Sequence, residues 1–345
     1  MSTRRTAAVS KTSPNRKALM ALAILVLTLI ADVAAFAAGQ RSEVSSPQGD
    51  ITLALAIDAA DPGTIYAGTL WNGVAKTTDG GANWRPTGLA HTSIFALVID
   101  PTHRATLYAG GNGVYKSTDG GATWTAVDGD LTELNATFSL VFDPTNPATL
   151  YAATSYGSVF KTIDGGTAWT AVDSGLPAHY TYSLVMDPAH PTTLYAGTYE
   201  GVFMTVNGGR RWTRVSSGLA EPSVNALVID PVHPATLYAG TSRGVFKTLD
   251  GGRTWAAAGS GLGDVSVSTL TIDPVSPATL YAVGGGVVFQ STDSGASWTA
   301  LGSGMGAAFV NILAVDPAHP ARIYAGTSGG IYRSADGGAS WNAGL

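Results

Sequence analysis

The stretch KTLDGGRTW, residues 247–255, decides the fold because the chain repeats it in seven variants. Each variant ends in an eight-residue unit that we call a box. The boxes are TTDGGANW (77–84), STDGGATW (117–124), TIDGGTAW (162–169), TVNGGRRW (205–212), TLDGGRTW (248–255), STDSGASW (291–298) and SADGGASW (334–341). They follow one another at intervals of 40, 45, 43, 43, 43 and 43 residues. Such a period is found in β-propellers and also in helical armadillo or HEAT arrays, so the local pattern must decide.

A second motif keeps the same interval and indicates that each repeat is built from strands. It reads LVIDPVHPATLYAGT at 227–241, and its acid recurs at Asp58, Asp100, Asp143, Asp187, Asp230, Asp273 and Asp316. Each repeat offers four short runs rich in Val, Ile, Tyr, Thr and Trp, separated by Asp-Pro or Gly-Gly turns. Four strands with their turns need about 40 residues. We therefore predict an all-β, seven-bladed β-propeller over residues 51–345, with four antiparallel strands per blade, A to D, and a box at each C–D turn.

The box has the pattern S/T-x-D-x-G-x-x-W, and on this pattern the chain resembles the BNR/Asp-box β-propeller superfamily. That superfamily includes sialidases, xyloglucanase-type glycoside hydrolases, the sortilin ectodomain and the photosystem II assembly factor. The resemblance covers residues 51–345 and implies the propeller fold. It implies little about activity, because unrelated functions share the box.

The box residues have structural tasks that explain their repetition. An Asp side chain accepts hydrogen bonds from turn N–H groups, and a Trp at the start of strand D can fill the gap between blades. Asn207 replaces the acid in the fourth box, where a charged catalytic base would be lost. We therefore assign structural roles to Asp79, Asp119, Asp164, Asn207, Asp250, Asp293 and Asp336, and to Trp84, Trp124, Trp169, Trp212, Trp255, Trp298 and Trp341.

The turns of a meander alternate between its two ends. The A–B turns and the boxes should share one face, which we call the box face, and the B–C turns and D–A segments the opposite one, the loop face. Histidines recur in the A–B turns at His103, His190, His233 and His319, and lysines precede the boxes at Lys76, Lys116, Lys161 and Lys247. A ring disperses both sets, so we predict turn-packing histidines, solvated lysines, no metal site and no cofactor.

The first 37 residues have the layout of a secretory signal: five cations, an apolar run over 18–31 and small residues at 35 and 37. We predict a signal peptide over 1–37, with an uncleaved membrane anchor as the alternative, and a linker over 38–50. Residues 41–47 align with a strand D and could pair with the last blade. Cleavage would leave 14 Lys+Arg and 23 Asp+Glu, a net charge of −9. This charge disfavours nucleic-acid binding.

We expect an extracytoplasmic monomer that meets a membrane only through an uncleaved N-terminus. Its candidate ligand surface is what remains after the repeat is subtracted. The loop face of blades 5 to 7 is nearly bare, whereas the earlier blades carry aromatic and polar side chains there. Such side chains are typical of surfaces that bind proteins or sugars. The candidate ligand-binding residues are Trp71, His91, Tyr156, His179, Tyr180, Tyr182, Tyr199 and Glu200.

Catalysis is the less favoured interpretation. A glycosidase needs two carboxylates about 5–9 Å apart, and Glu200 with Glu133 or Asp130 is the pair to test. The arginine triad that the sialidase resemblance implies is missing, because Arg243 alone lies in a B–C turn. The sequence thus favours an exported binding or scaffolding module for a protein partner or an extracellular glycan. The alternatives are a glycoside hydrolase of the Asp-box type and an assembly factor for a membrane complex.

Overall fold

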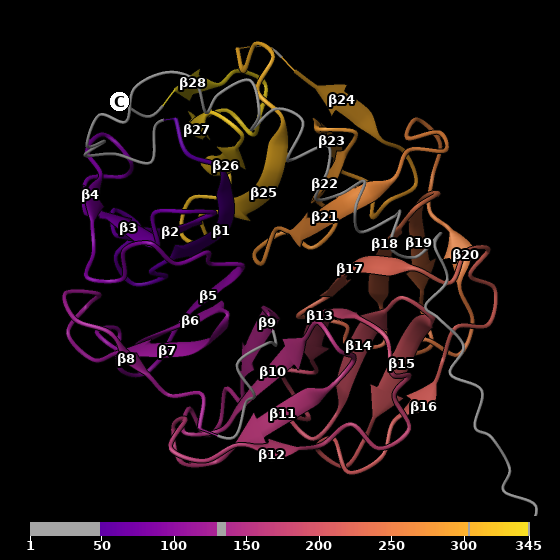
Figure 1. The fold of residues 1–345 in the computed structure, drawn as a ribbon. Helices are drawn as coiled ribbons and strands as arrows, with labels where there is room; N and C mark the ends of the chain where they lie inside the picture. Colours follow the sequence, from indigo (N-terminus) through magenta and orange to yellow (C-terminus); the bar gives the residue numbers. More distant parts are fainter. Residues whose placement is uncertain (1–48, 130–135, 303, 344–345) are drawn as a thin grey trace, which may run out of the picture. The chain divides into compact units, whose positions relative to one another are not determined.

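The computed structural model describes residues 49–129, 136–302 and 304–343, which form seven four-stranded sheets arranged in a ring (Figure 1). Within each sheet the strands follow chain order and neighbours are antiparallel. The predicted all-β propeller of seven blades is therefore confirmed. None of the residues in these three ranges forms a helix long and apolar enough to cross a membrane.

The first strands of the blades are β1 (Thr52–Ile57), β5 (Ala96–Ile99), β9 (Thr137–Phe142), β13 (Thr181–Met186), β17 (Val224–Ile229), β21 (Val267–Ile272) and β25 (Val310–Val315). The second strands are β2 (Ile65–Thr69), β6 (Leu107–Gly111), β10 (Leu150–Thr154), β14 (Leu194–Thr198), β18 (Leu237–Thr241), β22 (Leu280–Gly284) and β26 (Ile323–Thr327). The third strands are β3 (Val74–Thr77), β7 (Gly113–Ser117), β11 (Val159–Thr162), β15 (Gly201–Thr205), β19 (Gly244–Thr248), β23 (Val287–Ser291) and β27 (Gly330–Ser334).

The fourth strands are shorter than the sequence pattern predicts. They are β4 (Arg85–Pro86), β8 (Thr125–Ala126), β12 (Thr170–Ala171), β16 (Thr213–Arg214), β20 (Ala256–Ala257), β24 (Thr299–Leu301) and β28 (Asn342–Ala343). In three blades the residue before the fourth strand is bonded to the preceding blade. The Trp212 backbone N–H donates to the Ser174 carbonyl at 2.8 Å, and Trp255 and Trp298 use their N–H groups in the same way.

The first strands lie at the centre of the ring, where each contacts the first strand of the next blade (Figure 1). The second strands are buried along their whole length. Each hydrophobic core cluster joins two neighbouring blades; one contains Tyr195 of blade 4 together with Leu227 and Phe246 of blade 5. The hydrophobic effect therefore holds blade against blade rather than filling each blade separately.

The boxes form compact hydrogen-bonded turns. In blade 5, Asp250 Oδ1 accepts from Thr248 Oγ1 at 2.7 Å and from the Thr254 N–H at 2.9 Å. The hydrogen bonds from Thr254 and Thr248 lower the pKa of Asp250 to about 2. Asn207 accepts the matching bonds, from Thr205 Oγ1 at 2.9 Å and the Arg211 N–H at 3.1 Å, without carrying a charge. The box turn therefore needs an acceptor oxygen rather than an acid.

The box tryptophans pack into the seams between blades. Trp212 is 2% exposed, and its Nε1 donates to the Val172 carbonyl of blade 3 at 2.7 Å. Trp169, Trp255 and Trp298 donate to the preceding blade in the same manner. Each of these indoles adds a hydrogen bond to the apolar area that it buries, because its N–H would otherwise be left without a partner.

The prediction that the four lysines are solvated is wrong. Lys116 Nζ lies 5.2 Å from the centre of the Tyr108 ring and donates to the Gly165 carbonyl in the box of the next blade at 3.0 Å. Lys76, Lys161 and Lys247 lie over Tyr66, Tyr151 and Tyr238 in the same way. All four charges meet a tyrosine face, and those of Lys76, Lys116 and Lys247 also reach a carbonyl of the next box across the seam.

The ring closes where blade 7 meets blade 1. The Tyr324 hydroxyl donates to the Gly80 carbonyl at 3.2 Å, and Asn311 Nδ2 donates to the Thr52 carbonyl at 3.3 Å. The sheet of blade 7 takes all four strands from residues 310–343. Residues 1–48 lie outside the described residues. They include the predicted signal peptide or anchor, the linker up to residue 48 and the possible pairing of 41–47.

Candidate functional site

In six blades a β-bulge near the start of the first strand leaves one residue without a partner at the inner edge of the loop face. In β13, Thr181 pairs with Thr198 and Ser183 with Gly197, so Tyr182 has no partner. In blade 2 the equivalent residue is Phe95, which directly precedes β5 and whose N–H donates to the Gly110 carbonyl opposite Ala96. Bulges re-aim side chains. We call these positions the bulge column: Leu53, Phe95, Phe138, Tyr182, Asn225, Ser268 and Asn311.

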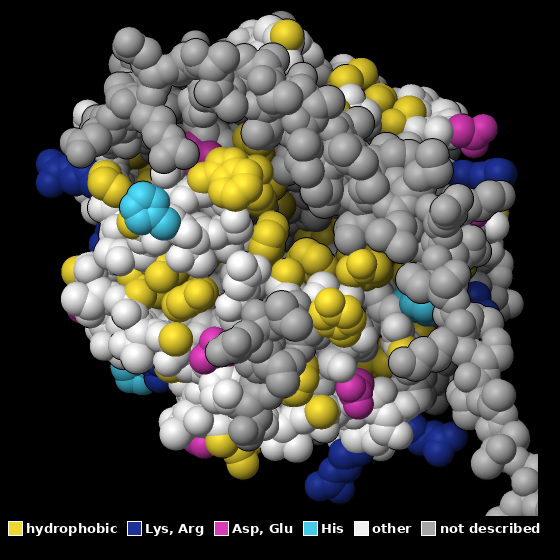
Figure 2. Space-filling model, in the orientation of Figure 1, with side chains coloured by type: hydrophobic (Ala, Val, Ile, Leu, Met, Phe, Trp, Pro, Cys, Tyr) yellow, Lys and Arg dark blue, Asp and Glu magenta, His cyan; other side chains and the backbone are white. Residues whose placement is uncertain are grey.

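The bulge column has an aromatic side and a polar side. The ring centres of Phe95 and Phe138 lie 5.6 Å apart, and those of Phe138 and Tyr182 lie 6.3 Å apart. In the next blade the column becomes polar: Asn225 Nδ2 donates to the Val267 carbonyl at 3.0 Å, a bond between blades 5 and 6. Figure 2 shows hydrophobic side chains around the centre of the ring, where Figure 1 places the first strands. A half-buried aromatic row thus runs over three neighbouring blades.

The aromatic row continues outward in blade 4. The Tyr180 ring stacks on Tyr182 with centres 5.8 Å apart and an angle of 11° between the planes. His179 lies edge-on to Tyr199 at 5.9 Å, and its Nε2 is 3.4 Å from Glu200 Oε1. The Tyr199 N–H donates to the Tyr180 carbonyl at 3.1 Å, and this bond holds the turn after β14 against the segment before β13. We call His179, Tyr180, Tyr182, Tyr199 and Glu200 the blade-4 cluster.

Tyr182 lies deepest in this cluster. Burial raises its pKa to about 12, with smaller contributions from the nearby hydroxyls of Tyr180 and Tyr199. Tyr182 therefore keeps its proton at neutral pH and presents a hydrogen-bond donor. The blade-4 cluster thus combines aromatic surface, phenolic donors and one carboxylate that is half-exposed.

Tyr156 borders the blade-4 cluster from blade 3. Its turn packs closely on the segment before β13, because a Cβ on Gly157 would lie 2.2 Å from the His179 carbonyl oxygen and 2.5 Å from that of Pro177. The Tyr156 side chain is 62% exposed. It therefore adds a free aromatic surface next to His179.

Trp71 and His91 are not brought together with the blade-4 cluster. Trp71 is 57% exposed in the turn after β2, and His91 has a φ of 59° in the segment after β4. Among residues 49–129, 136–302 and 304–343, no ring contact or ion pair joins either of them to the cluster. The structure therefore divides the predicted ligand-binding residues into a cluster on blades 3 and 4 and separate exposed side chains on blade 1.

The candidate catalytic pair cannot be built from the described residues, because Asp130 and Glu133 lie outside them. Glu200 is the one member that is described, and it contacts His179 at 3.4 Å. The four A–B turn histidines each lie near the acid of their own turn; His190 Nδ1 is 3.1 Å from Asp187 Oδ2. Within the described part of the chain, no three His, Asp or Glu side chains could hold a metal ion.

Sequence reasoning missed Phe95 and Phe138, although a signal was present. When the repeats are aligned on the Leu that lies two residues further along in every blade, the bulge column reads Leu, Phe, Phe, Tyr, Asn, Ser, Asn. The change from apolar to polar falls between blades 4 and 5. Phe138 lies within β9 and Phe95 directly precedes β5, and so a search of the turns alone passes over them.

Comparison with known proteins places the fold in a family. The DUF6242 beta propeller domain matches residues 65–263, more than half of the chain. The chain belongs to this family. Residues 205–345 of this family member also match the photosynthesis system II assembly factor YCF48. None of the curated proteins matches the sequence.

Solved structures share the fold at low identity. An ancestral GH74 enzyme is 20% identical with a TM-score of 0.73, over 88% of this chain and 47% of its own. The GH74 xyloglucanase from Xanthomonas campestris is 16% identical with a TM-score of 0.71, over 88% and 56%. The chain thus spans about half the length of these enzymes. YCF48 bound to D1 peptide is 16% identical with a TM-score of 0.66, over 84% of this chain and 95% of its own.

Proposed function

We propose that the propeller is an exported binding module that holds a protein partner on its loop face, at the blade-4 cluster. One observation carries this proposal: half-buried aromatic side chains of three blades form one row, and in blade 4 this row continues to the Tyr180 hydroxyl and the pair of His179 with Glu200. Tyr and Trp side chains supply large contact areas and a polar tip, and they dominate the energetics of protein interfaces. The repeated seams elsewhere bury their aromatic residues and leave no comparable cluster among the described residues.

The proposal favours a protein over a glycan for two reasons. Tyr180 and Tyr182 stack on each other, so each uses one ring face that a sugar would need. The chain also covers 95% of YCF48, a single-propeller protein whose structure holds a D1 peptide, but only 47% and 56% of the two glycoside hydrolases. The similarity to YCF48 supports a binding role for this propeller.

The test is a paired peptide-array and glycan-array screen with the mature chain, followed by affinity measurements on the best ligand. We expect peptide ligands, and we expect Tyr199→Ala and His179→Ala each to weaken binding about tenfold or more, as interface anchors do. Trp71→Ala is the matched control, because it removes an exposed aromatic residue of the same face outside the cluster. It should leave the affinity within about twofold.

Three outcomes would overturn the proposal. Binding to glycans alone would assign a carbohydrate ligand instead. Equal losses in Trp71→Ala and Tyr199→Ala would show that the ligand contacts the loop face of blade 1 as strongly as the blade-4 cluster. Turnover of a glycan that Glu200→Gln abolishes would make the protein a glycoside hydrolase.

Export is the second part of the proposal, and the residues that bear on it are 1–37. The basic start, the apolar run and the small residues at 35 and 37 support a signal peptide. N-terminal sequencing of the protein from the extracytoplasmic fraction should give a chain that starts at Ala38. A full-length chain in the membrane fraction would favour the anchor, and a cytoplasmic location would contradict export.

A further inference from the structure

One position of the third strands repeatedly bridges the seam to the next blade. It is occupied by Lys76, Lys116, Lys161, Met204, Lys247, Gln290 and Arg333. Lys76, Lys116 and Lys247 donate to a box carbonyl of the next blade at 2.9–3.0 Å. Gln290 Nε2 bonds to the Tyr281 hydroxyl at 3.0 Å and to the Gly337 carbonyl at 3.5 Å. The polar side chains at this position therefore normally have a partner across the seam.

Arg333 departs from this pattern at the seam between blades 7 and 1. Its Nε is buried and has no hydrogen-bond partner. No carboxylate in the described ranges forms an ion pair with its guanidinium. In blade 1, Tyr66 and Lys76 both donate to the Gly120 carbonyl of the next box. The matching carbonyl of Gly80 accepts from the Tyr324 hydroxyl at 3.2 Å but receives no hydrogen bond from Arg333. A buried N–H without an acceptor costs free energy and calls for an explanation.

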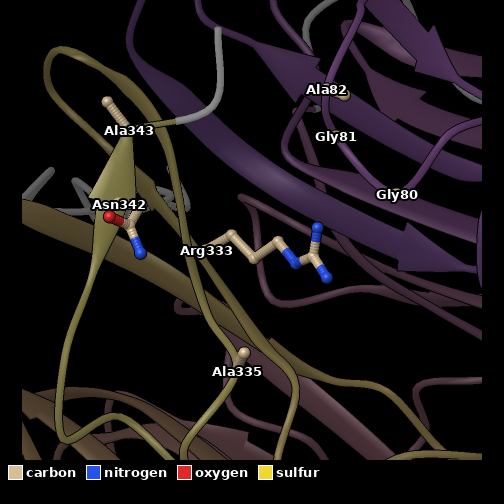
Figure 3. Close-up of a pocket in the computed structure, with 7 residues that line it drawn as sticks. All are labelled: Gly80, Gly81, Ala82, Arg333, Ala335, Asn342 and Ala343. Atoms are coloured by element: carbon tan, nitrogen blue, oxygen red, sulfur yellow. The ribbon is translucent and has the colours of Figure 1, made fainter.

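The guanidinium of Arg333 points into a pocket on the box face. Figure 3 shows its side chain extending from β27 toward the box of blade 1. A Cβ on Gly80 would lie 3.9 Å from Arg333 Nη1, so the group lies directly across the seam. The pocket is lined by Gly80, Gly81, Ala82, Arg333, Ala335, Asn342 and Ala343.

The pocket has room because small residues surround Arg333. Ala335 occupies the second position of its box, where the other six boxes have Thr, Ile, Val or Leu. The acids of the two adjoining boxes do not fill the space, since they serve their own turns. Asp79 accepts from Asn83 and Thr77, and Asp336 accepts from Ser340 and Ser334. The guanidinium thus faces a space lined by glycine and alanine with its donors uncommitted.

We infer that this pocket is a carboxylate-binding site with Arg333 as the recognising group. A guanidinium presents parallel N–H donors whose spacing matches the two oxygens of a carboxylate, and such pairs are charge-assisted. Asn342 of β28 lines the same pocket and offers an amide. The carboxylate comes either from an acidic side chain of a bound protein or from a free small acid. The site lies on the box face, and it stands independently of the ligand proposed for the loop face.

The test is an NMR titration of the mature chain at constant ionic strength, which follows the arginine Nε–Hε signals and, in the wild type and every variant, the backbone amide signals of Gly80 and Gly81 that line the pocket. The probes are acetate, a tetraglutamate peptide and sulfate. We expect saturable shifts of the Arg333 signal with both carboxylate probes and weaker binding of sulfate. Arg333→Gln should weaken carboxylate binding about tenfold or more, because it removes the charge-assisted pair.

Arg333→Lys is the decisive variant, because it gives the blade 7 seam the residue found at Lys76 and Lys247. It should keep the thermal stability of the chain, since a lysine can reach the Gly80 carbonyl, yet lose carboxylate binding to the same extent as Arg333→Gln. Arg253→Lys, a change of the same kind in a box, should leave binding unchanged. Tighter binding of tetraglutamate than of acetate would assign a protein source, and equal binding a free acid.

Either of two results would overturn the inference. One is an Arg333 Nε–Hε signal that does not respond to acetate or tetraglutamate. The other is equal carboxylate affinity in the wild-type chain and in Arg333→Lys.

Discussion

The two faces of the propeller are built on the same strands but behave in opposite ways. On the box face, one set of contacts recurs: a box acid or amide accepts the turn hydrogen bonds, and a tryptophan enters the seam. On the loop face the bulge column changes from Phe95, Phe138 and Tyr182 to Asn225, Ser268 and Asn311 around the ring. Repetition therefore marks residues that pack blades together.

The comparison also shows that repetition alone does not separate packing from recognition. Arg333 lies on the box face at a repeated position, but it lacks the partner that Lys116 has there. The informative residues are those that break the pattern of contacts, on whichever face they lie. The following predictions test this difference between repeated and variable positions.

The largest expected effect is at a repeated tryptophan. Trp212→Ala removes a buried indole and its hydrogen bond to the Val172 carbonyl. We expect the free energy of unfolding to fall by about 3–5 kcal/mol, as measured by urea denaturation. Trp71→Ala is the matched control on the loop face, and it should change stability by less than about 0.5 kcal/mol. Similar losses of unfolding free energy in the two variants would contradict the distinction between the two faces.

A smaller effect is expected at a seam lysine. Lys247→Met removes a contact with the Tyr238 ring of the same blade and a hydrogen bond to the Ser294 carbonyl of the next blade. The expected loss of unfolding free energy is about 1–2 kcal/mol, and methionine is a fitting replacement because Met204 occupies the same position in blade 4. Lys247→Gln should cost less, since Gln290 makes the matching bonds in blade 6. A loss in Lys247→Gln as large as in Lys247→Met would show that the carbonyl bond is unimportant.

The smallest effect concerns Tyr182 and alkaline pH. Its folded pKa of about 12 lies above the value of about 10 for an unfolded tyrosine. The protonated hydroxyl is therefore favoured in the folded state, and this contribution to stability is present below pH of about 10 and lost as the pH rises through about 12. The phenolate absorbance of the wild type minus that of Tyr182→Phe should show one step near pH 12. Tyr156→Phe should leave this step in place, and a step near pH 10 would place Tyr182 in open solvent.

The sequence predicted those parts of the molecule whose contacts are local. The box turn is complete within eight residues, so Asp250 and Thr254 could be assigned from their spacing alone. The half-buried turn residues Tyr199 and Glu200 were likewise predictable from their departure from the repeat. Phe95 and Phe138 were missed because their significance lies in a contact between strands 43 residues apart. The lysines were misjudged because a side chain that is exposed in one blade is covered by the next.

The sequence by itself determined the number of blades, the order of the strands and the turns, because hydrogen bonds between near neighbours and a period near 43 residues encode them. Only the tertiary structure decided which side chains meet across the seams. It brought His179, Tyr182, Tyr199 and Glu200 into one cluster, separated Trp71 from them, and left Arg333 without a partner. The physical reason is that these contacts depend on the rotation between successive blades, which no single repeat contains.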